Sequence, residues 1–143
     1  MLTDALKNTD KLLRKFVGTL VGLALLGLIA GCAVAPETQA KINQYNATIP
    51  SCSDPGDCER KWAEARRWTL QNSDFPLFTE SETRIHASST LSTSAGVGII
   101  VHREVYGDGY EFLVEVECFT VYGCPDTWDR KLDFNQTLNG AGS

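Results

Sequence analysis

Cysteine spacing is the feature of this chain that most directly suggests chemistry. Four of the five cysteines form two sets with the same gap of five residues, Cys52 with Cys58 and Cys118 with Cys124. Each gap contains a glycine that favours a turn, so we expect two local disulfides in an oxidising compartment. Pairing across the two sets stays an alternative. A four-cysteine zinc site is another, although zinc ligands usually have shorter gaps.

The histidines are a weaker candidate for chemistry. His86 and His102, the two histidines of the chain, fall on neighbouring predicted strands. Their side chains could share one sheet face with several glutamates, namely Glu80, Glu82, Glu104 and Glu115. No ligand spacing closes a coordination sphere, so we favour a charged, solvated surface over a metal site. Glu115 and Glu117 point the same way from one strand, which indicates a like-charged surface rather than a hydrolase pair.

Sequence motifs of catalysis do not accompany these residues. The chain has neither a Gly-x-Ser-x-Gly elbow nor an HExxH helix. Gly96-Val97-Gly98 lacks the third glycine of a phosphate-binding turn. The tryptophans Trp62, Trp68 and Trp128 fit a core better than a ligand platform. We therefore expect a protein that is not an enzyme and that needs no cofactor.

The fifth cysteine, Cys32, follows a segment typical of an export signal. Basic residues come first, and an uncharged apolar run from Phe16 to Ala30 follows them. The run ends in Ile29-Ala30-Gly31-Cys32, which resembles the lipobox of bacterial lipoproteins. The resemblance implies that a signal peptide, residues 1–31, is removed and that Cys32 carries acyl chains. An uncleaved transmembrane helix over 16–35 is the alternative, which the glycines of this stretch disfavour.

Lipoproteins of this kind in enteric bacteria tend to stay in the inner membrane when aspartate follows the cysteine. Here Ala33 follows, so the resemblance implies the outer membrane, with the protein facing the periplasm. Cleavage would leave 112 residues with nine basic and sixteen acidic side chains, a net charge of −7. This balance argues against a nucleic-acid partner and leaves the lipid on Cys32 as the membrane contact.

The remaining chain is long enough for one small domain. Ala33 to Pro50 has no sustained apolar periodicity, so residues 32–50 are predicted to be the lipidated cysteine and a flexible tether. The domain would occupy residues 51–140, and 141–143 would be a short tail.

Periodicity within that domain predicts an α+β fold. A first, amphipathic helix is expected over Cys58 to Ser73, with Asp57 as its cap, and a second over Pro125 to Asn139, ended by Gly140. Three strands are expected between them, over Leu77–Ala87, Val97–Tyr106 and Tyr110–Val121, the last two joined as a hairpin by Gly107-Asp108-Gly109. We expect a three-stranded antiparallel sheet with two helices on one face and the other face wet.

The segment from Cys58 to Trp68, together with Cys118-x5-Cys124-Pro125, is similar to a group of small uncharacterised proteobacterial lipoproteins. The likeness spans about Cys52 to Asn139 and supports the fold and the anchor without implying an activity. We expect a non-enzymatic envelope module that binds another envelope protein through a sheet face or an edge strand. The alternative is a small-ligand or metal-binding domain, which would need a pocket between helices and sheet.

Overall fold

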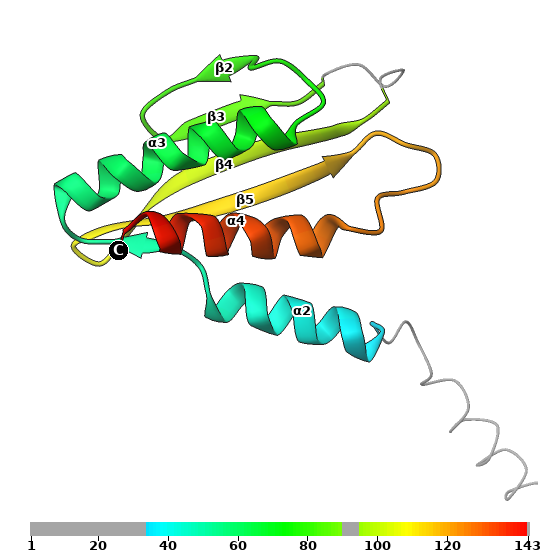
Figure 1. Ribbon diagram of the computed structural model, residues 1–143, viewed down its shortest axis with the longest axis horizontal. Helices are drawn as coiled ribbons and strands as arrows, with labels where there is room; N and C mark the ends of the chain where they lie inside the picture. The colour runs from blue at the N-terminus through cyan, green and yellow to red at the C-terminus, as the bar shows by residue number, and fades with distance from the viewer. Residues whose placement is uncertain (1–33, 90–94, 143) are drawn as a thin grey trace, which may run out of the picture. The chain divides into compact units, whose positions relative to one another are not determined.

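A computed structural model describes residues 34–89 and 95–142, so the export segment and Cys32 lie outside it. The chain divides into two compact units, Met1–Ala35 and Pro36–Ser143, and every helix and strand below belongs to the second. Along the chain this unit runs α2, β1, α3, β2, β3, β4, β5 and α4 (Figure 1). The expected α+β class is confirmed.

One antiparallel sheet forms the centre of this unit, with the strand order β1-β5-β4-β3-β2. Its main part is the hairpin of β4, Val97–Tyr106, and β5, Gly109–Cys118, whose register runs from Val97 opposite Cys118 to Tyr106 opposite Gly109. Gly107 turns the chain with a φ of 56°, a conformation that glycine adopts at little cost. The predicted hairpin is therefore present, with its turn at the predicted place.

The sheet has five strands rather than the three expected. The segment predicted as one strand from Leu77 to Ala87 is folded back on itself as β2, Thr79–Glu80, and β3, Arg84–Ala87. Ser81 makes the bend, because its hydroxyl accepts hydrogen bonds from the N–H groups of Thr83 at 3.3 Å and Arg84 at 3.1 Å. The remaining additional strand, β1, consists only of Ser51–Cys52 and pairs with β5.

Helices α3, Pro55–Asn72, and α4, Thr127–Ala141, cover one face of the sheet (Figure 1). α3 begins three residues earlier than predicted, since Asp54 rather than Asp57 caps it and accepts the N–H of Asp57 at 2.9 Å. α4 begins after Pro125 and continues through Gly140, which does not end it. Both predicted helices exist, with shifted ends.

A third helix, α2, Pro36–Ala47, occupies most of the segment predicted to be a flexible tether. Tyr45 of this helix is buried, and its carbonyl oxygen accepts a hydrogen bond from Asn135 Nδ2 of α4 at 3.0 Å. Lys41 Nζ, in the second turn of α2, lies 2.8 Å from Asp129 Oδ1 in the first turn of α4. α2 therefore runs beside α4 in the same direction. One aromatic side chain and several polar contacts hold it there, so its sequence shows no sustained run of apolar residues at helical spacing.

The apolar core lies between the sheet and the helices. It includes fully buried residues from β3, β4, β5 and α4: Ile85, Ile99, Val101, Phe112, Phe134 and Leu138. Trp68 of α3 is buried with them, packs edge-on against Phe134 at 5.1 Å, and donates its indole N–H to Asp133 at 2.7 Å. Trp68 thus belongs to the core, as predicted.

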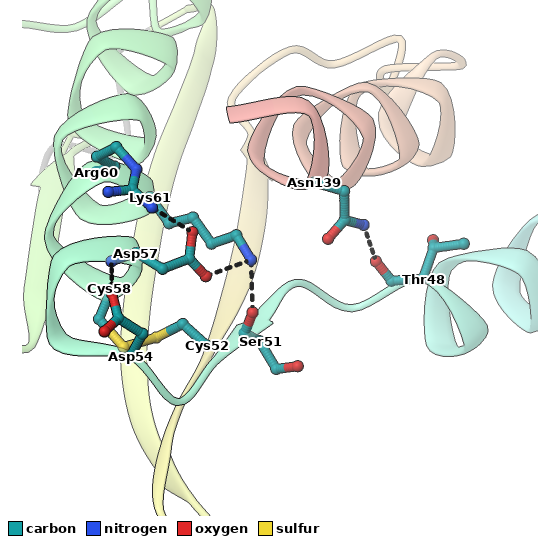
Figure 2. A network of polar contacts seen from close by, with 9 residues as sticks. All are labelled: Thr48, Ser51, Cys52, Asp54, Asp57, Cys58, Arg60, Lys61 and Asn139. Atoms are coloured by element: carbon teal, nitrogen blue, oxygen red, sulfur yellow. Dashed lines mark hydrogen bonds and ion pairs between the residues drawn. A yellow bond between two sulfur atoms is a disulfide. The ribbon is translucent and has the colours of Figure 1, made fainter. Parts of the chain in front are cut away.

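The start of α3 is fixed by a small polar network around Lys61 (Figure 2). The Lys61 ammonium, almost fully buried, donates to the carbonyl oxygen of Ser51 at 2.6 Å and lies 3.0 Å from Asp57. The disulfide between Cys52 and Cys58 lies in the same region (Figure 2). Together these contacts attach β1 to the first turns of α3.

Candidate functional site

The two histidines lie on the sheet face away from α3 and α4. Register puts His86 of β3 opposite Ile100 of β4, two residues before His102, so the histidines are diagonal neighbours. The His86 ring packs edge-on against Phe78 at 5.5 Å, and His102 Nε2 lies 3.3 Å from Glu115. Ile100 between them is buried, so this face is less wet than expected.

The glutamates expected beside the histidines divide between the two faces of the sheet. Glu80 accepts the Arg66 side chain at 3.0 Å on the α3 side. Glu104 and Glu115 share the face of His102, because Glu104 follows it by two residues on β4 and Glu115 lies opposite Ile100. Glu117 accepts a hydrogen bond from Ser88 and lies two residues beyond Glu115 on the same face of β5. Across 34–89 and 95–142, no group of three or more histidine, cysteine, aspartate or glutamate side chains could hold a metal ion.

The four cysteines beyond Cys32 form two local disulfides. Cys52 is bonded to Cys58 and Cys118 to Cys124, each with a sequence separation of six. The first bond attaches β1 to α3, and the second closes the chain that leads from β5 to α4. These cysteines are structural crosslinks, and the lipidation candidate Cys32 lies outside the described residues.

A cleft that the sequence did not reveal opens between α3, the hairpin and the turn from β2 to β3. Its volume is about 330 Å³. It is lined by side chains from all three parts of the fold: Glu59, Trp62, Glu82, Thr83, Arg103 and Tyr110. A cavity of this size is in the range used by small ligands. Four of its six lining residues are polar, namely Glu59, Glu82, Thr83 and Arg103.

Arg103 is the central group of this cleft. Its side chain is only 11% exposed, and its guanidinium carbon lies 4.2 Å from the ring centre of Tyr110 and 5.8 Å from that of Trp62. Nη2 donates to Glu59 at 2.9 Å, while the buried Nε has no hydrogen-bond partner. Trp62 stacks in turn on Phe112 of the core, so the aromatic wall beside Arg103 is held firmly.

The lining groups of the cleft carry both charge signs. Arg103 is the cation, fixed between two aromatic rings, and the carboxylates of Glu59 and Glu82 lie at the same cleft. A guanidinium in this setting recognises a carboxylate or another flat anionic group.

One signal in the sequence could have found Arg103. In β4 the side chains of Val97, Ile99 and Val101 alternate toward the helices, and Arg103 is next in the same phase. A charged side chain at an inward position is uncommon unless it has partners. The strand pattern could therefore have identified Arg103 as a candidate functional residue.

Comparison with models of protein families, with characterised proteins and with solved structures found no match for this chain. Among the helices of the described segments, none has both the length and the apolar character needed to cross a bilayer.

Proposed function

We propose that this protein is a lipid-anchored, non-enzymatic interaction module of the bacterial cell envelope. The observation that carries the proposal is the run Ile29-Ala30-Gly31-Cys32 after a basic and then an apolar segment. Two disulfides in so small a domain are consistent with export to an oxidising compartment. Ala33 after the cysteine favours the outer membrane, with the domain in the periplasm.

The partner of this module would be an extended segment of another envelope protein. At the β5 edge, the N–H of Phe112 donates to Pro50 at 2.9 Å and that of Val114 to the Tyr45 hydroxyl at 3.4 Å. At the other edge, β2 forms the outer strand and both its residues are exposed. Phe78, 62% exposed, lies next to it. A strand added beside β2 would gain backbone hydrogen bonds and an apolar contact with Phe78.

Mass spectrometry of the mature N-terminus tests the anchor. We expect a chain that begins at Cys32 with acyl chains attached, and a Cys32→Ser variant that retains its signal and takes up no labelled palmitate. A wild-type chain with an intact residue 1, or with an unmodified Cys32, would contradict the proposal.

A photo-crosslinker tests the partner site. We expect a crosslinker at position 78 to capture one envelope protein in cells, and the same group at the exposed Leu70 of α3 to capture none. Equal capture from both positions would show that the β2 edge has no special role.

A second candidate function is binding of a small carboxylate in the cleft around Arg103. The observation that favours it is the hydrogen bond from Arg103 Nη2 to Glu59. The Glu59 side chain is 68% exposed, so it can turn toward solvent and leave Nη2 to a ligand. A ligand carboxylate would take the place of Glu59, with an aromatic body against Tyr110. Benzoate is a suitable probe, by ligand-observed NMR: Glu59→Gln should strengthen its binding and Arg103→Gln should abolish it. Binding that neither substitution changes would contradict this assignment.

A further inference from the structure

The turn between β5 and α4 carries the two most exposed large apolar side chains of the described residues. Val121 is 93% exposed and Tyr122 is 96% exposed. A second adjacent valine and tyrosine, Val105 and Tyr106, are 80% and 61% exposed at the tip of the β4–β5 hairpin. Exposure alone is common on protein surfaces, so the place of each pair relative to the anchor decides which one can meet a membrane. We call residues 120–123 the apolar turn.

The apolar turn is held in one conformation. The disulfide between Cys118 and Cys124 closes the chain around it. Within it, the Gly123 N–H donates to the carbonyl oxygen of Thr120 at 3.2 Å, and the Thr120 hydroxyl donates to that of Gly123 at 2.8 Å. Gly123 has a φ of 74°, which glycine adopts without strain. Val121 and Tyr122 therefore occupy the two central positions of a fixed turn.

The same end of this unit is where the preceding chain enters it. α2 begins at Pro36, and Lys41 in its second turn is paired with Asp129 in the first turn of α4 at 2.8 Å. α4 itself begins three residues after Cys124. The first turn of α2 and the apolar turn therefore lie at one end of this unit, as Figure 1 shows.

Chain length brings a membrane to that end. Cys32 precedes Pro36 by four residues, which span at most about 14 Å when extended. This step rests on the proposed lipid anchor at Cys32. A spanning helix over 16–35 would bring the bilayer to the same point.

Charge at this end is close to balanced. Asp126 lies 2.8 Å from Arg130, and Lys41 lies 2.8 Å from Asp129 and 3.7 Å from the exposed Glu37 of α2. These three carboxylates face two cations, so about one net negative charge remains to be repelled by anionic lipid, and salt screens it.

We propose that the apolar turn inserts Val121 and Tyr122 into the headgroup region of the membrane to which Cys32 is attached. Tyrosine is favoured there, because its ring is apolar and its hydroxyl stays hydrated. Two side chains alone bind a bilayer weakly, but an anchor a few residues from α2 keeps them at high local concentration. The lipid would hold the protein on the membrane, and the apolar turn would set its orientation.

Fluorescence quenching by brominated lipid tests this contact. The full lipidated chain is reconstituted into phosphatidylethanolamine and phosphatidylglycerol vesicles that carry bromine on the acyl chains. A Tyr122→Trp variant is compared with Tyr106→Trp, whose parent tyrosine is 61% exposed at the other end of the hairpin. The emission of the introduced tryptophan is the difference between each variant and the wild type. We expect bromine to quench this emission in Tyr122→Trp, and we expect the emission of Tyr106→Trp to be equal in brominated and unbrominated vesicles.

Flotation of the same vesicles separates the two proposals. Chains that float while Tyr122→Trp is quenched no more than Tyr106→Trp would overturn the membrane contact and leave the anchor standing. Chains that do not float would overturn the anchor and the contact together. Because both tyrosines are exposed, both variants should keep the thermal unfolding midpoint of the wild type.

Discussion

Replacement of Tyr45 by alanine tests whether α2 is a packed helix or a flexible tether. Tyr45 is buried, its ring centre lies 6.0 Å from that of Trp128, and its hydroxyl accepts the N–H of Val114 at 3.4 Å. Truncation of a buried aromatic residue costs about 3–5 kcal/mol, and the low end applies because α2 lies at the margin of the core and can relax. We expect a loss of about 3 kcal/mol, of which about 1 kcal/mol belongs to the hydroxyl.

Urea unfolding of the full chain in detergent, followed by tryptophan fluorescence, measures this loss. With an m-value of about 1.5 kcal/mol per molar urea, Tyr45→Ala should lower the midpoint by about 2 M. Tyr45→Phe should lose about 1 kcal/mol, since it leaves the Val114 N–H without its acceptor. Trypsin should also cleave after Lys41 faster in Tyr45→Ala than in the wild type.

Asn46→Ala is the matched control, because Asn46 is exposed on the same helix. Its stability should stay within about 0.5 kcal/mol of the wild type. If Tyr45→Ala also stayed within that range, α2 would not be packed against the domain, and the reasoning from its contacts would be wrong.

Three further predictions concern the crosslinks and charges of the fold. Lys61→Met should cost about 2 kcal/mol by urea unfolding, because the Ser51 carbonyl and Asp57 lose a buried partner, whereas the exposed Arg60→Met should cost under about 0.5 kcal/mol. A cost for Arg60→Met as large as that for Lys61→Met would refute the assignment. Each disulfide closes an equally short loop that contributes about 2 kcal/mol. Replacement of Cys52 and Cys58 by serine should nevertheless lower the free energy of unfolding more than replacement of Cys118 and Cys124, because only the first pair is buried. Equal losses of unfolding free energy would contradict this prediction. Burial raises the pKa of Tyr45 above 10.0, although the Val114 N–H offsets part of the effect. The neutral phenol is thus favoured by folding, so this contribution is present below pH 10 and lost as pH rises through the folded pKa. An ultraviolet titration in which Tyr45→Phe removed no late step would count against it.

The parts of the fold that sequence reasoning found are those specified by neighbours along the chain. The hairpin of β4 and β5 has an alternating pattern and a glycine turn, and both are local. β1 is a strand only because Ser51 and Cys52 meet β5, since two residues carry no period of their own. α2 was missed for a related reason: one buried tyrosine in a polar helix gives no amphipathic signal, and Asn135 supplies its partner from 90 residues away.

The candidate site divides in the same way. The strands and the shared face of His86 and His102 could be predicted, because strand alternation fixes which side chains lie together. The cleft around Arg103 could not, since it needs Trp62 from α3 and Tyr110 from β5 to meet across the fold. In the sequence, the one local sign of this cleft was that Arg103 falls at a position of β4 that points toward the helices.

Packing of α2 changes what a lipid on Cys32 would do. A flexible tether of eighteen residues would leave the domain without a preferred orientation, with a typical end-to-end span of about 20–25 Å. With α2 packed against α4, Cys32 lies only four residues before Pro36, and this stretch spans at most about 14 Å. A lipid on Cys32 would then select the end of this unit that carries Val121 and Tyr122, and would turn the β4–β5 hairpin tip and Tyr106 away from the bilayer. A substitution that releases α2, such as Tyr45→Ala, should therefore weaken the quenching of Tyr122→Trp without releasing the chain from the vesicle.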